Sequence, residues 1–301
     1  MAEFDVLVVG DANPDLLLRG DVRPRFGQAE QLLTAADLVL GGSAAITAAG
    51  CARLGLRTAL FAAVGADVFG RIVRDDLAAR GVTLLAADGR GAPTGISIVL
   101  SEQDDRGILT LPGTIPALRP ADVTDELLAR ARHVHVSSLY LQPALAAGLA
   151  EIFARAGKIG LTTSLDTNWD PDEKWESIKE VLAHTDVFLP NANELRAITG
   201  LDKSDEAAAS LVANGTTVVM KDGARGARAW WPGGTYAAPG RQVDVVDTTG
   251  AGDSFNAGFL AARLGGRPIE EAIRWAAAAG SLSTRAAGGT AAQATRDEIS
   301  L

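Results

Sequence analysis

The segment Asp247-Thr-Thr-Gly-Ala-Gly-Asp253 is the most informative stretch of this sequence, because it joins a glycine-rich turn to the start of a helix and leaves a carboxylate there. Apolar residues recur at helical spacing in the stretch 255–260 that follows, and the valines in 243–246 before it have strand character. We therefore expect the glycines at a point where a strand passes into a helix.

The three residues of the turn, Gly250, Ala251 and Gly252, have little or no side chain to block an anion. Backbone N–H groups in the first turn of a helix lack partners within the helix. Together with the positive end of the helix dipole, they can hold a phosphate or a transferring phosphoryl group. Asp253 would lie beside that group and could accept the proton of an attacking hydroxyl. A glycine-rich loop that caps a buried helix, with Asp253 as partner of the helix dipole, explains the same residues without a ligand.

The composition limits the partners. With 301 residues, of which 47% are hydrophobic, the chain can form one large α/β unit with a continuous core. A net charge of -9 argues against nucleic acid and anionic membrane surfaces, since both need a clustered basic face. The start of the chain lacks a secretion signal, its apolar stretches are too short to span a membrane, and its single cysteine excludes an internal disulfide. We therefore expect a cytoplasmic protein.

Stretches of strand and helix character alternate along most of the chain. The expected strands are 4–9, 58–64, 133–136, 161–165, 187–189 and 216–220, and the expected helices are 44–54, 68–79, 144–156 and 175–183. This alternation predicts an α/β fold with a doubly wound, mostly parallel sheet flanked by helices. In such sheets ligands bind at the carboxyl ends of the strands.

Two segments, 16–40 and 94–111, interrupt the alternation with short β-like runs separated by polar turns. They predict a small antiparallel sheet that projects from the main body. The sequence has no internal repeat, low-complexity linker or clean domain boundary. The expected organisation is a single domain over 1–301 with a discontinuous β lid formed by about 13–40 and 93–113.

Polar side chains follow the first expected strand. Asp11, Asn13 and Asp15 lie in Gly10-Asp-Ala-Asn-Pro-Asp15, where carboxylates and an amide can bind adjacent hydroxyls of a sugar. An Asx-rich turn accounts for them equally well. Further on, Gly41-Gly42-Ser43 opens the next helix and lets the backbone pass close to a ligand.

Three further motifs fall just after expected strands: Asp166-Thr-Asn168, Pro190-Asn191-Ala-Asn-Glu194 and Lys221-Asp-Gly223-Ala-Arg-Gly226. Asn191 and Glu194 are spaced i and i+3 on one face of a starting helix, so both can reach a magnesium-phosphate group. An ordinary helix cap explains the same pair. A hairpin turn would likewise explain the glycines of the third motif, and a simple turn would explain the first.

In residue order, Asp247 to Asp253 resembles the C-terminal signature of the ribokinase family of carbohydrate kinases, also called the PfkB family. The other motifs occur in the family's order, so the resemblance covers nearly the whole chain. It implies a ribokinase-like fold, phosphoryl transfer from ATP with Mg²⁺, and a β lid that closes over the sugar. In many relatives this lid pairs with the lid of a second subunit, so we expect a homodimer formed through the lid.

The resemblance also assigns roles to individual residues. It implies that Asp253 is the catalytic base and that Gly250, Ala251 and Gly252 form the anion hole. Contacts with the substrate carry over to Asn13, Asp15, Gly41, Gly42 and Ser43, with Asp11 adjacent. Contacts with the nucleotide carry over to Asn168, Asn191, Glu194, Lys221, Gly223, Gly226, Ala277 and Gly289. Among these, Asn191 and Glu194 would hold Mg²⁺ through water, and Asp247 and Thr249 match positions that contribute to a K⁺ site in many relatives.

The sequence departs from the family pattern at four positions, which are Ser43 in place of a lysine, Ile46 and Ala277 in place of asparagines, and Asp170 in place of an arginine. An apolar Ile46 cannot bind a hydroxyl, so we expect free ribose to be a poor substrate if this side chain faces the site.

These observations predict an ATP-dependent sugar kinase that phosphorylates a primary hydroxyl of a sugar or sugar derivative. A nucleoside kinase of the same fold is an alternative, because Ile46 and Trp169 leave room for an apolar base. A catalytically silent sugar sensor is a third, against which the intact Asp253 and glycine turn argue.

Overall fold

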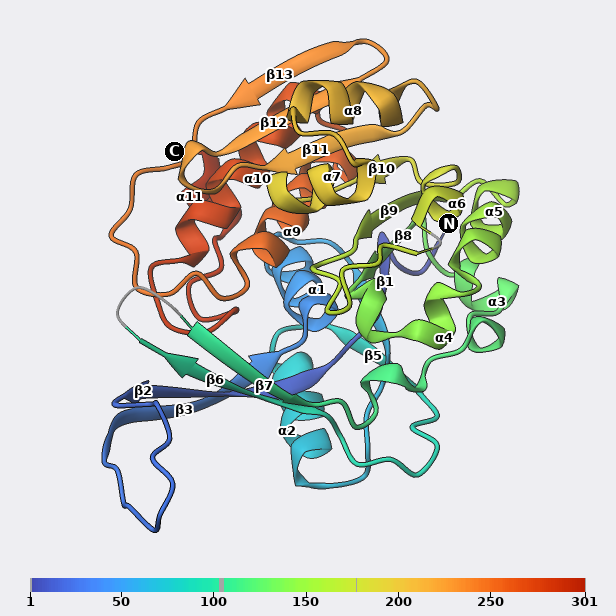
Figure 1. The fold of residues 1–301 in the computed structure, drawn as a ribbon. Helices are drawn as coiled ribbons and strands as arrows, with labels where there is room; N and C mark the ends of the chain where they lie inside the picture. Colours follow the sequence, from blue (N-terminus) through green and yellow to red (C-terminus); the bar gives the residue numbers. More distant parts are fainter. Residues whose placement is uncertain (1, 103–105, 177, 301) are drawn as a thin grey trace.

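The computed structural model describes residues 2–102, 106–176 and 178–300. Within these residues, the larger sheet has nine strands in the order β13-β12-β11-β10-β9-β8-β1-β4-β5 (Figure 1). Neighbours from β11 through β5 pair in parallel, whereas β12 and β13 form an antiparallel edge. The strands are β1 (Val6–Val9), β4 (Thr58–Ala63), β5 (Thr83–Ala87), β8 (His133–Ser137), β9 (Thr162–Asp166), β10 (Val187–Phe188), β11 (Thr217–Lys221), β12 (Ala227–Trp231) and β13 (Gly234–Ala238).

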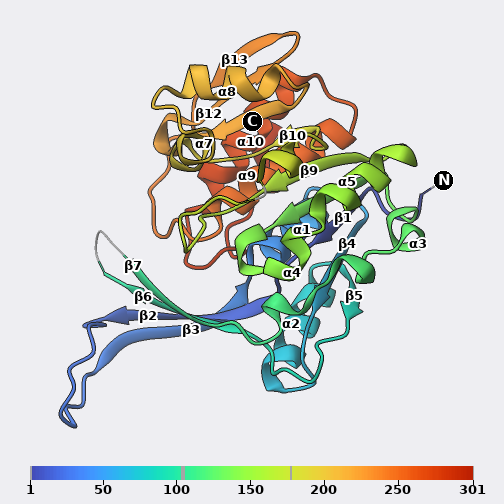
Figure 2. The same ribbon diagram turned by 45° about the vertical axis from the view of Figure 1, so that its right-hand side comes forward.

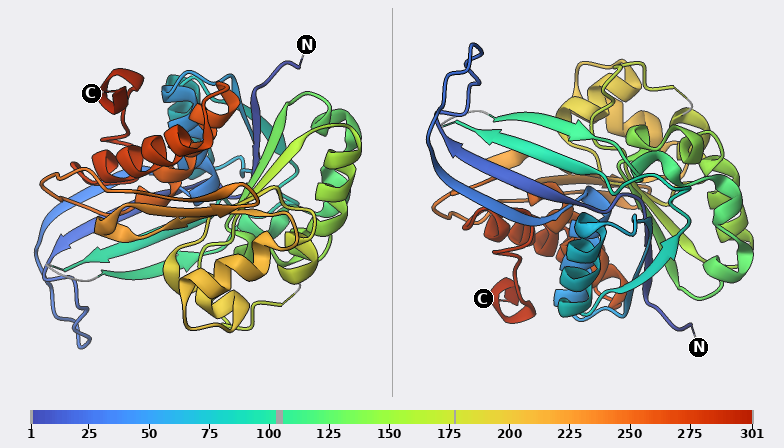
Figure 3. Two further views of the ribbon diagram at one scale, coloured as in Figure 1. Left: turned by 90° about the horizontal axis from the view of Figure 1, so that it is seen from above. Right: turned by 90° about the horizontal axis from the view of Figure 1, so that it is seen from below.

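Helices cover both faces of this sheet, as the views along its edge show (Figure 3). One face carries α1 (Ser43–Arg53), α2 (Val68–Ala79), α9 (Ala251–Leu264), α10 (Ile269–Ser283) and α11 (Arg296–Ser300). The other carries α3 (Asp125–Leu128), α4 (Pro143–Ala146), α5 (Leu149–Lys158), α6 (Ile178–Leu182), α7 (Ala192–Thr199) and α8 (Ser204–Val212). Short 3₁₀ turns lie at η1 (Ile115–Ala117), η2 (Pro120–Asp122), η3 (Leu139–Leu141) and η4 (Gly223–Arg225).

The central strands are apolar on both sides because each side packs against helices. In β1, Val6 and Val8 join the core beneath α1 and α9, whereas Leu7 and Val9 join the core on the opposite face. This arrangement confirms the predicted doubly wound α/β fold.

A second sheet projects from the body beside α2 (Figures 1 and 2). Its strands, in the order β3-β2-β6-β7, are β2 (Asn13–Gly20), β3 (Leu33–Gly41), β6 (Ile96–Ser101) and β7 (Arg106–Leu111). The outer pairs are antiparallel, as predicted for the lid. The central pair, β2 and β6, is parallel because both strands leave the body at the base of the lid and run towards its tip.

Two local predictions were wrong. The valine-rich stretch 243–246 forms no strand, and Val245 and Val246 are 62% and 63% exposed. No strand among the described residues pairs with this stretch. Its last residues are anchored instead by the N–H groups of Val246 and Asp247, which donate to the carbonyl of Thr284 at the end of α10. The expected helix 144–156 is divided into α4 and α5 by a turn at 147–148. Among the described residues, no helix has the length and apolar character needed to cross a membrane.

Candidate active site

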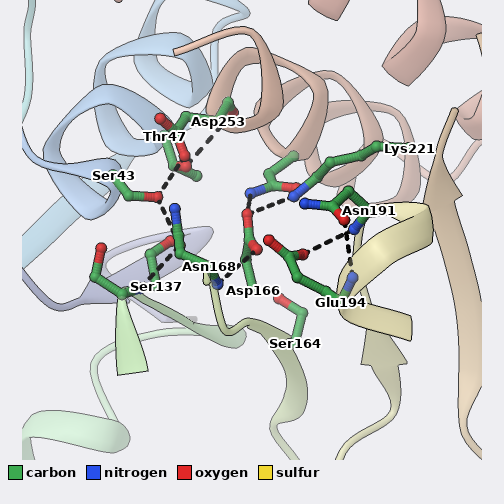
Figure 4. Close-up of polar contacts among 12 residues, drawn as sticks. Ser43, Thr47, Ser137, Ser164, Asp166, Asn168, Asn191, Glu194, Lys221 and Asp253 are labelled. Atoms are coloured by element: carbon green, nitrogen blue, oxygen red, sulfur yellow. Dashed lines mark hydrogen bonds and ion pairs between the residues drawn. The ribbon is translucent and has the colours of Figure 1, made fainter. Parts of the chain in front are cut away.

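Close packing between α1 and α9 brings the two glycine motifs together. A Cβ atom on Gly50 of α1 would stand 2.7 Å from Cβ of Ala257 in α9, so only a glycine lets the helices approach this closely. As a result the first residue of α1, Ser43, lies beside Asp253 in the first turn of α9, and the hydroxyl of Ser43 donates a hydrogen bond to Oδ1 of Asp253 (Figure 4).

Backbone conformation and packing require a glycine at one position of the turn but not at the other. Gly250 precedes α9 in the left-handed region, with φ +69°, and a Cβ there would stand 2.5 Å from Cα of Gly289. Gly252, in contrast, is helical, and a Cβ would make only ordinary contacts of 3.5 to 3.7 Å with the side chain of Lys221. Packing therefore explains the glycine at 250 but not the one at 252. At 252, the absent side chain leaves space for a ligand beside the amine of Lys221.

Asp253 is buried, and this burial raises the pKa of its carboxyl group to about 8. The negative charges of Asp166 and Asp11 act in the same direction, whereas the hydrogen bond from Ser43 and the charge of Lys221 oppose the rise. A carboxylate with a pKa near 8 is a stronger base than an ordinary aspartate, and it lies where the turn could hold a phosphoryl group.

Asn168 connects this site to the ends of β8 and β9. It adopts a left-handed conformation, φ 54°, which is unusual for a residue other than glycine and is often found at functional sites. Its Oδ1 lies 3.2 Å from the hydroxyl of Ser43 and accepts a hydrogen bond of 3.2 Å from the backbone N–H of Ser138. The amide of Asn168 is thereby fixed beside Ser43 (Figure 4).

Of the three polar residues after β1, Asp11 has a structural task. Its two oxygens accept hydrogen bonds from the backbone N–H groups of Ser43 and Ala44 and from the hydroxyl of Ser138. Asp11 therefore anchors the start of α1, and both of its oxygens are engaged.

Asn13 and Asp15 are both buried and lie in contact with each other at the base of the lid. Nδ2 of Asn13 donates to Oδ1 of Asp15 over 3.0 Å, and burial raises the pKa of Asp15 to about 7, with Asp11 adding to the rise. The carboxylate of Asp15 lies directly over Gly41, where any Cβ would overlap with it.

A second charged cluster lies at the ends of β9 and β11. Nζ of Lys221 is 2.5 Å from Oδ2 of Asp166, and Nδ2 of Asn256 donates to the same oxygen over 2.6 Å (Figure 4). Burial alone would raise the pKa of Asp166, but Lys221 and Asn256 outweigh it and hold that pKa below its ordinary value. Asp166 is therefore a permanent negative charge behind the glycine turn.

Asn191 and Glu194 form a reciprocal cap at the start of α7. Oδ1 of Asn191 accepts from the N–H of Glu194 over 2.9 Å, and Oε2 of Glu194 accepts from the N–H of Asn191 over 2.8 Å. Burial raises the pKa of Glu194 to about 7, and the charge of Asp166 adds to the effect. Asn191 and Glu194 thus form the helix cap that was the alternative interpretation of this motif. The carboxyl group of Glu194 is buried and faces Asp166 and Lys221.

Carboxylate oxygens are the ligands that Mg²⁺ prefers, so Glu194 fits this ion chemically. Among the described residues, however, no group of three or more histidine, cysteine, aspartate or glutamate side chains could hold a metal. A magnesium ion here would accordingly be held mainly by water and by the phosphates of a nucleotide.

Asp247 and Thr249 stabilise the turn itself. Oδ1 of Asp247 accepts from the N–H and the hydroxyl of Thr249 over 2.9 and 2.8 Å, and Oδ2 accepts from the N–H of Gly288 over 2.8 Å. The hydroxyl of Thr249 also accepts from Nη1 of Arg106, over 3.0 Å. These hydrogen bonds hold the turn in shape, and a monovalent cation at this place stays a prediction.

The remaining residues assigned to the nucleotide lie on several elements. Gly223 and Gly226 form the hairpin turn between β11 and β12, as the alternative interpretation expected. Ala277 is buried within α10, and Gly289 packs against Ile46. Because Ile46 is itself buried beneath Gly250 and Gly289, its side chain supports the two turns. Ile46 therefore gives no reason to expect that ribose is a poor substrate.

Sequence reasoning missed several residues of the site. Asn256 follows Asp253 at i+3, so helical spacing could have placed it on the same face of α9. Ser138, also left-handed with φ 54°, carries no recognisable local signal, and neither does Arg106, which reaches the site from the lid.

The model of the pfkB family of carbohydrate kinases matches residues 4–296. A relative from Halopiger xanaduensis, named ATP-dependent ribose-1-phosphate kinase, is 33% identical over 287 residues, covering 92% of this chain and 91% of that protein. Ribokinase of Arabidopsis thaliana in complex with ribose and ATP superimposes with a TM-score of 0.82 at 26% identity, covering 99% of this chain and 98% of that one. Adenosine kinase of Sinorhizobium meliloti superimposes with a TM-score of 0.85 at 26% identity, covering 96% of each chain.

The chain therefore belongs to the pfkB family of carbohydrate kinases. This confirms the family that the motifs predicted, and with it the predicted class of enzyme, an ATP-dependent sugar kinase.

Proposed function

We propose that this protein transfers the γ-phosphoryl group of ATP to a primary hydroxyl of a sugar or sugar derivative. The observation that carries the proposal is the position of Asp253, which is buried, bonded to Ser43 and directly follows a turn whose Gly252 leaves space for a ligand beside Lys221. A base, an anion hole and a cationic side chain thereby meet at one place.

In the proposed reaction, the acceptor hydroxyl lies within hydrogen-bond reach of Asp253. Its proton passes to the carboxylate of Asp253 as its oxygen forms a bond to the γ-phosphorus, and the bond to ADP breaks with its electron pair staying on ADP. The N–H groups of Gly250, Ala251 and Gly252 would stabilise the charge on the transferring group, that of Ala251 by exchanging its hydrogen bond to the carbonyl of Thr248. Mg²⁺, held through water by Glu194, would neutralise phosphate charge.

Asn13 and Asp15 at the base of the lid would bind hydroxyls of the acceptor, and the lid would exclude water from the phosphoryl group. Lys221, now paired with Asp166, would contact the phosphates of ATP through its remaining hydrogens. We also propose that two copies pair through their lids. The name of the Halopiger relative makes a phosphorylated sugar a reasonable acceptor to test.

A nucleoside kinase is the second candidate. Trp169, next to Asn168, is 44% exposed and packs edge-on against Trp175 with ring centroids 5.1 Å apart. An exposed ring at this place could stack on a base. The similarity to adenosine kinase supports the same candidate. A silent sensor has less support, because Asp253 and the glycine turn are intact in the sequence.

The test is ADP formation across pentoses, ketohexoses, sugar acids, sugar phosphates and nucleosides, with the Asp253→Asn variant as the blank. We expect a strong preference for one class, and no turnover above the blank with any acceptor would refute the proposal.

A further inference from the structure

The side chains on the inner face of the lid form three rows across strands β2, β6 and β7. In register, the rows are Asp15, Ser97 and Thr110 near the base, then Leu17, Val99 and Ile108, and then Arg19, Ser101 and Arg106 towards the tip. This face is turned towards the body, because Leu17 packs against Gly288 and Arg106 bonds to Thr249. The lid therefore offers a polar row, an apolar row and a basic row in succession.

The basic row borders a cavity of about 800 Å³ between the tip of the lid and the stretch 245–248. Its polar lining consists of Arg19, Ser101, Glu102 and Arg106 from the lid and of Asp247 and Thr248 from the body. The basic row lies four residues along β2 from Asp15, which corresponds to about 13 Å. A ligand that reaches from Asp15 towards the tip would thus meet the two guanidinium groups.

Arg106 is held where it can act on the acceptor. Its Nη1 donates to the hydroxyls of Thr249 over 3.0 Å and Thr248 over 3.4 Å. Its charge also reaches Asp15, where it is one of the smaller effects that oppose the rise of the pKa caused by burial. Arg106 consequently stands between the carboxylate at the base of the lid and the turn before α9.

Arg19 is paired with Asp37 on the neighbouring strand, but the two side chains are 36% and 47% exposed. Ion pairs at such exposed positions contribute little to stability, so a better partner can replace Asp37. Glu102 also borders the cavity, and its carboxylate is bonded to Arg23. Asp247 lines the cavity as a second carboxylate, and its oxygens accept hydrogen bonds from the N–H groups of Thr249 and Gly288. The two arginines are the cationic groups of this lining that could bind an oxyanion.

We propose that Arg19, Ser101 and Arg106 form a subsite for an anionic group of the acceptor, so that the enzyme phosphorylates a sugar that already carries a phosphate or a carboxylate. The inference rests on the proposed kinase function and adds the class of acceptor. Guanidinium groups suit the role because their paired N–H groups match two oxygens of a phosphate or carboxylate. A neutral sugar has no anionic group that these guanidinium groups could bind.

The test compares kcat/KM for ribose 1-phosphate, ribonate and ribose at saturating ATP. All three carry a primary hydroxyl, and the first two separate a phosphate from a carboxylate. We expect one anionic acceptor to exceed ribose by about 10- to 100-fold, the range of a hydrogen bond to a charged group. Arg106→Met and Arg19→Met should each reduce this ratio by about tenfold or more. Arg25→Met, which removes the same charge from the lid loop outside the cavity, should leave the ratio unchanged.

Ribose as the best of the three acceptors, or an unchanged ratio in both variants, would overturn the proposal. The same holds if Arg106→Met raises only the KM for ATP, because the arginine would then serve the nucleotide. If no acceptor is phosphorylated, the kinase function fails instead. Calorimetric binding of ribose 1-phosphate then tests the subsite independently, and it should weaken about tenfold in Arg106→Met but not in Arg25→Met.

Discussion

The amine of Lys221 and the carboxylate of Asp166 form a buried ion pair of 2.5 Å at the carboxyl ends of two strands that are not neighbours, β11 and β9. Their side chains are 14% and 2% exposed, and Asn256 donates a further hydrogen bond to the same oxygen of Asp166. The pair fixes the lysine beside Gly252, where the phosphates of ATP would lie. The negative charge of Asp166 helps to raise the pKa values of Asp253 and Glu194, whereas the positive charge of Lys221 opposes this rise.

Replacing Lys221 by methionine should therefore affect both stability and catalysis. The change leaves a buried carboxylate that accepts hydrogen bonds from Asn256 and from the N–H of Asn168 but has lost its cationic partner. Breaking such a pair costs about 3 to 5 kcal/mol. The double variant Lys221→Met with Asp166→Asn removes both charges and should recover much of this stability, as measured by urea unfolding. It should not recover the KM for ATP. Recovery of both would show that the lysine acts only on the fold.

The Asp253→Asn variant should fold and bind ATP normally but lose at least about 10²-fold in kcat, the usual scale for a positioned base. The amide has nearly the shape of the carboxyl group but cannot accept the proton. Calorimetry with ATP and steady-state kinetics separate the two effects. Ser43→Ala is the matched control, since it removes only the hydrogen bond that orients Asp253 and should cost less. Near-normal turnover in Asp253→Asn would place the base elsewhere.

The activity should rise with pH. Asp253 acts as a base only when ionised, and its raised pKa of about 8 means that the ionised fraction of the free enzyme grows as the pH increases towards 8 and beyond. At subsaturating concentrations of both substrates, kcat/KM should therefore rise about tenfold per pH unit below this value and level off above it. Below pH 7, protonation of Asp15 should steepen the fall, because its pKa is about 7. A profile that is flat between pH 6 and 9 would contradict this account.

The glycines of the turn should respond differently to alanine. Gly250→Ala introduces a clash with Gly289 and a strained left-handed residue, so it should lower the melting temperature by several degrees. Gly252→Ala meets no such obstacle and should melt close to the wild type, while its methyl group hinders the phosphoryl group and lowers kcat. Gly252→Val should abolish turnover. Full activity in both variants at position 252 would locate the anion hole elsewhere.

The sequence was sufficient for the sheet and its flanking helices because the buried strands carry apolar side chains on both faces. It failed at Val245 and Val246, since strand character in a short segment does not reveal whether a partner strand exists. In the described part of the chain, no strand pairs with this segment. Two elements, β5 at the edge of the sheet and α8, were not predicted. The position of these two elements in the fold is set by the strands and helices against which they pack.

For the site, local motifs identified the residues that follow strand ends but not how they are connected. The contact of Asp166 with Asn256 joins positions 90 residues apart, and the bond from Arg106 to Thr249 spans 143. Such contacts are set by the packing of whole elements, so no local pattern encodes them. The same limit applies to Ile46, whose position on α1 was identified but whose burial beneath the turns was not.

The lid itself leads to the last prediction. Its outer face carries the cross-strand row Leu38, Leu16, Ile98 and Leu109, and of these Leu38 and Leu109 are 43% and 59% exposed. The sequence predicts that Leu38, Leu40, Ile98 and Leu100 alternate between the sugar side and the partner side of the lid. Instead the cross-strand register places Leu38, Ile98 and Leu100 on this outer face, whereas Leu40 is buried at the base.

An apolar sheet face of this kind is normally covered, and a second copy of the lid is a cover of matching shape and character. We expect a homodimer by light scattering coupled to size exclusion at assay concentration. Leu109→Glu should yield a monomer with reduced kcat, because an uncovered lid closes less well over the acceptor. Ile159→Glu, at a similarly exposed position at the end of α5, should remain dimeric and active. A wild-type monomer with full activity would defeat the proposal. A dimer that persists in Leu109→Glu would move the contact to the helices and remove its link to catalysis.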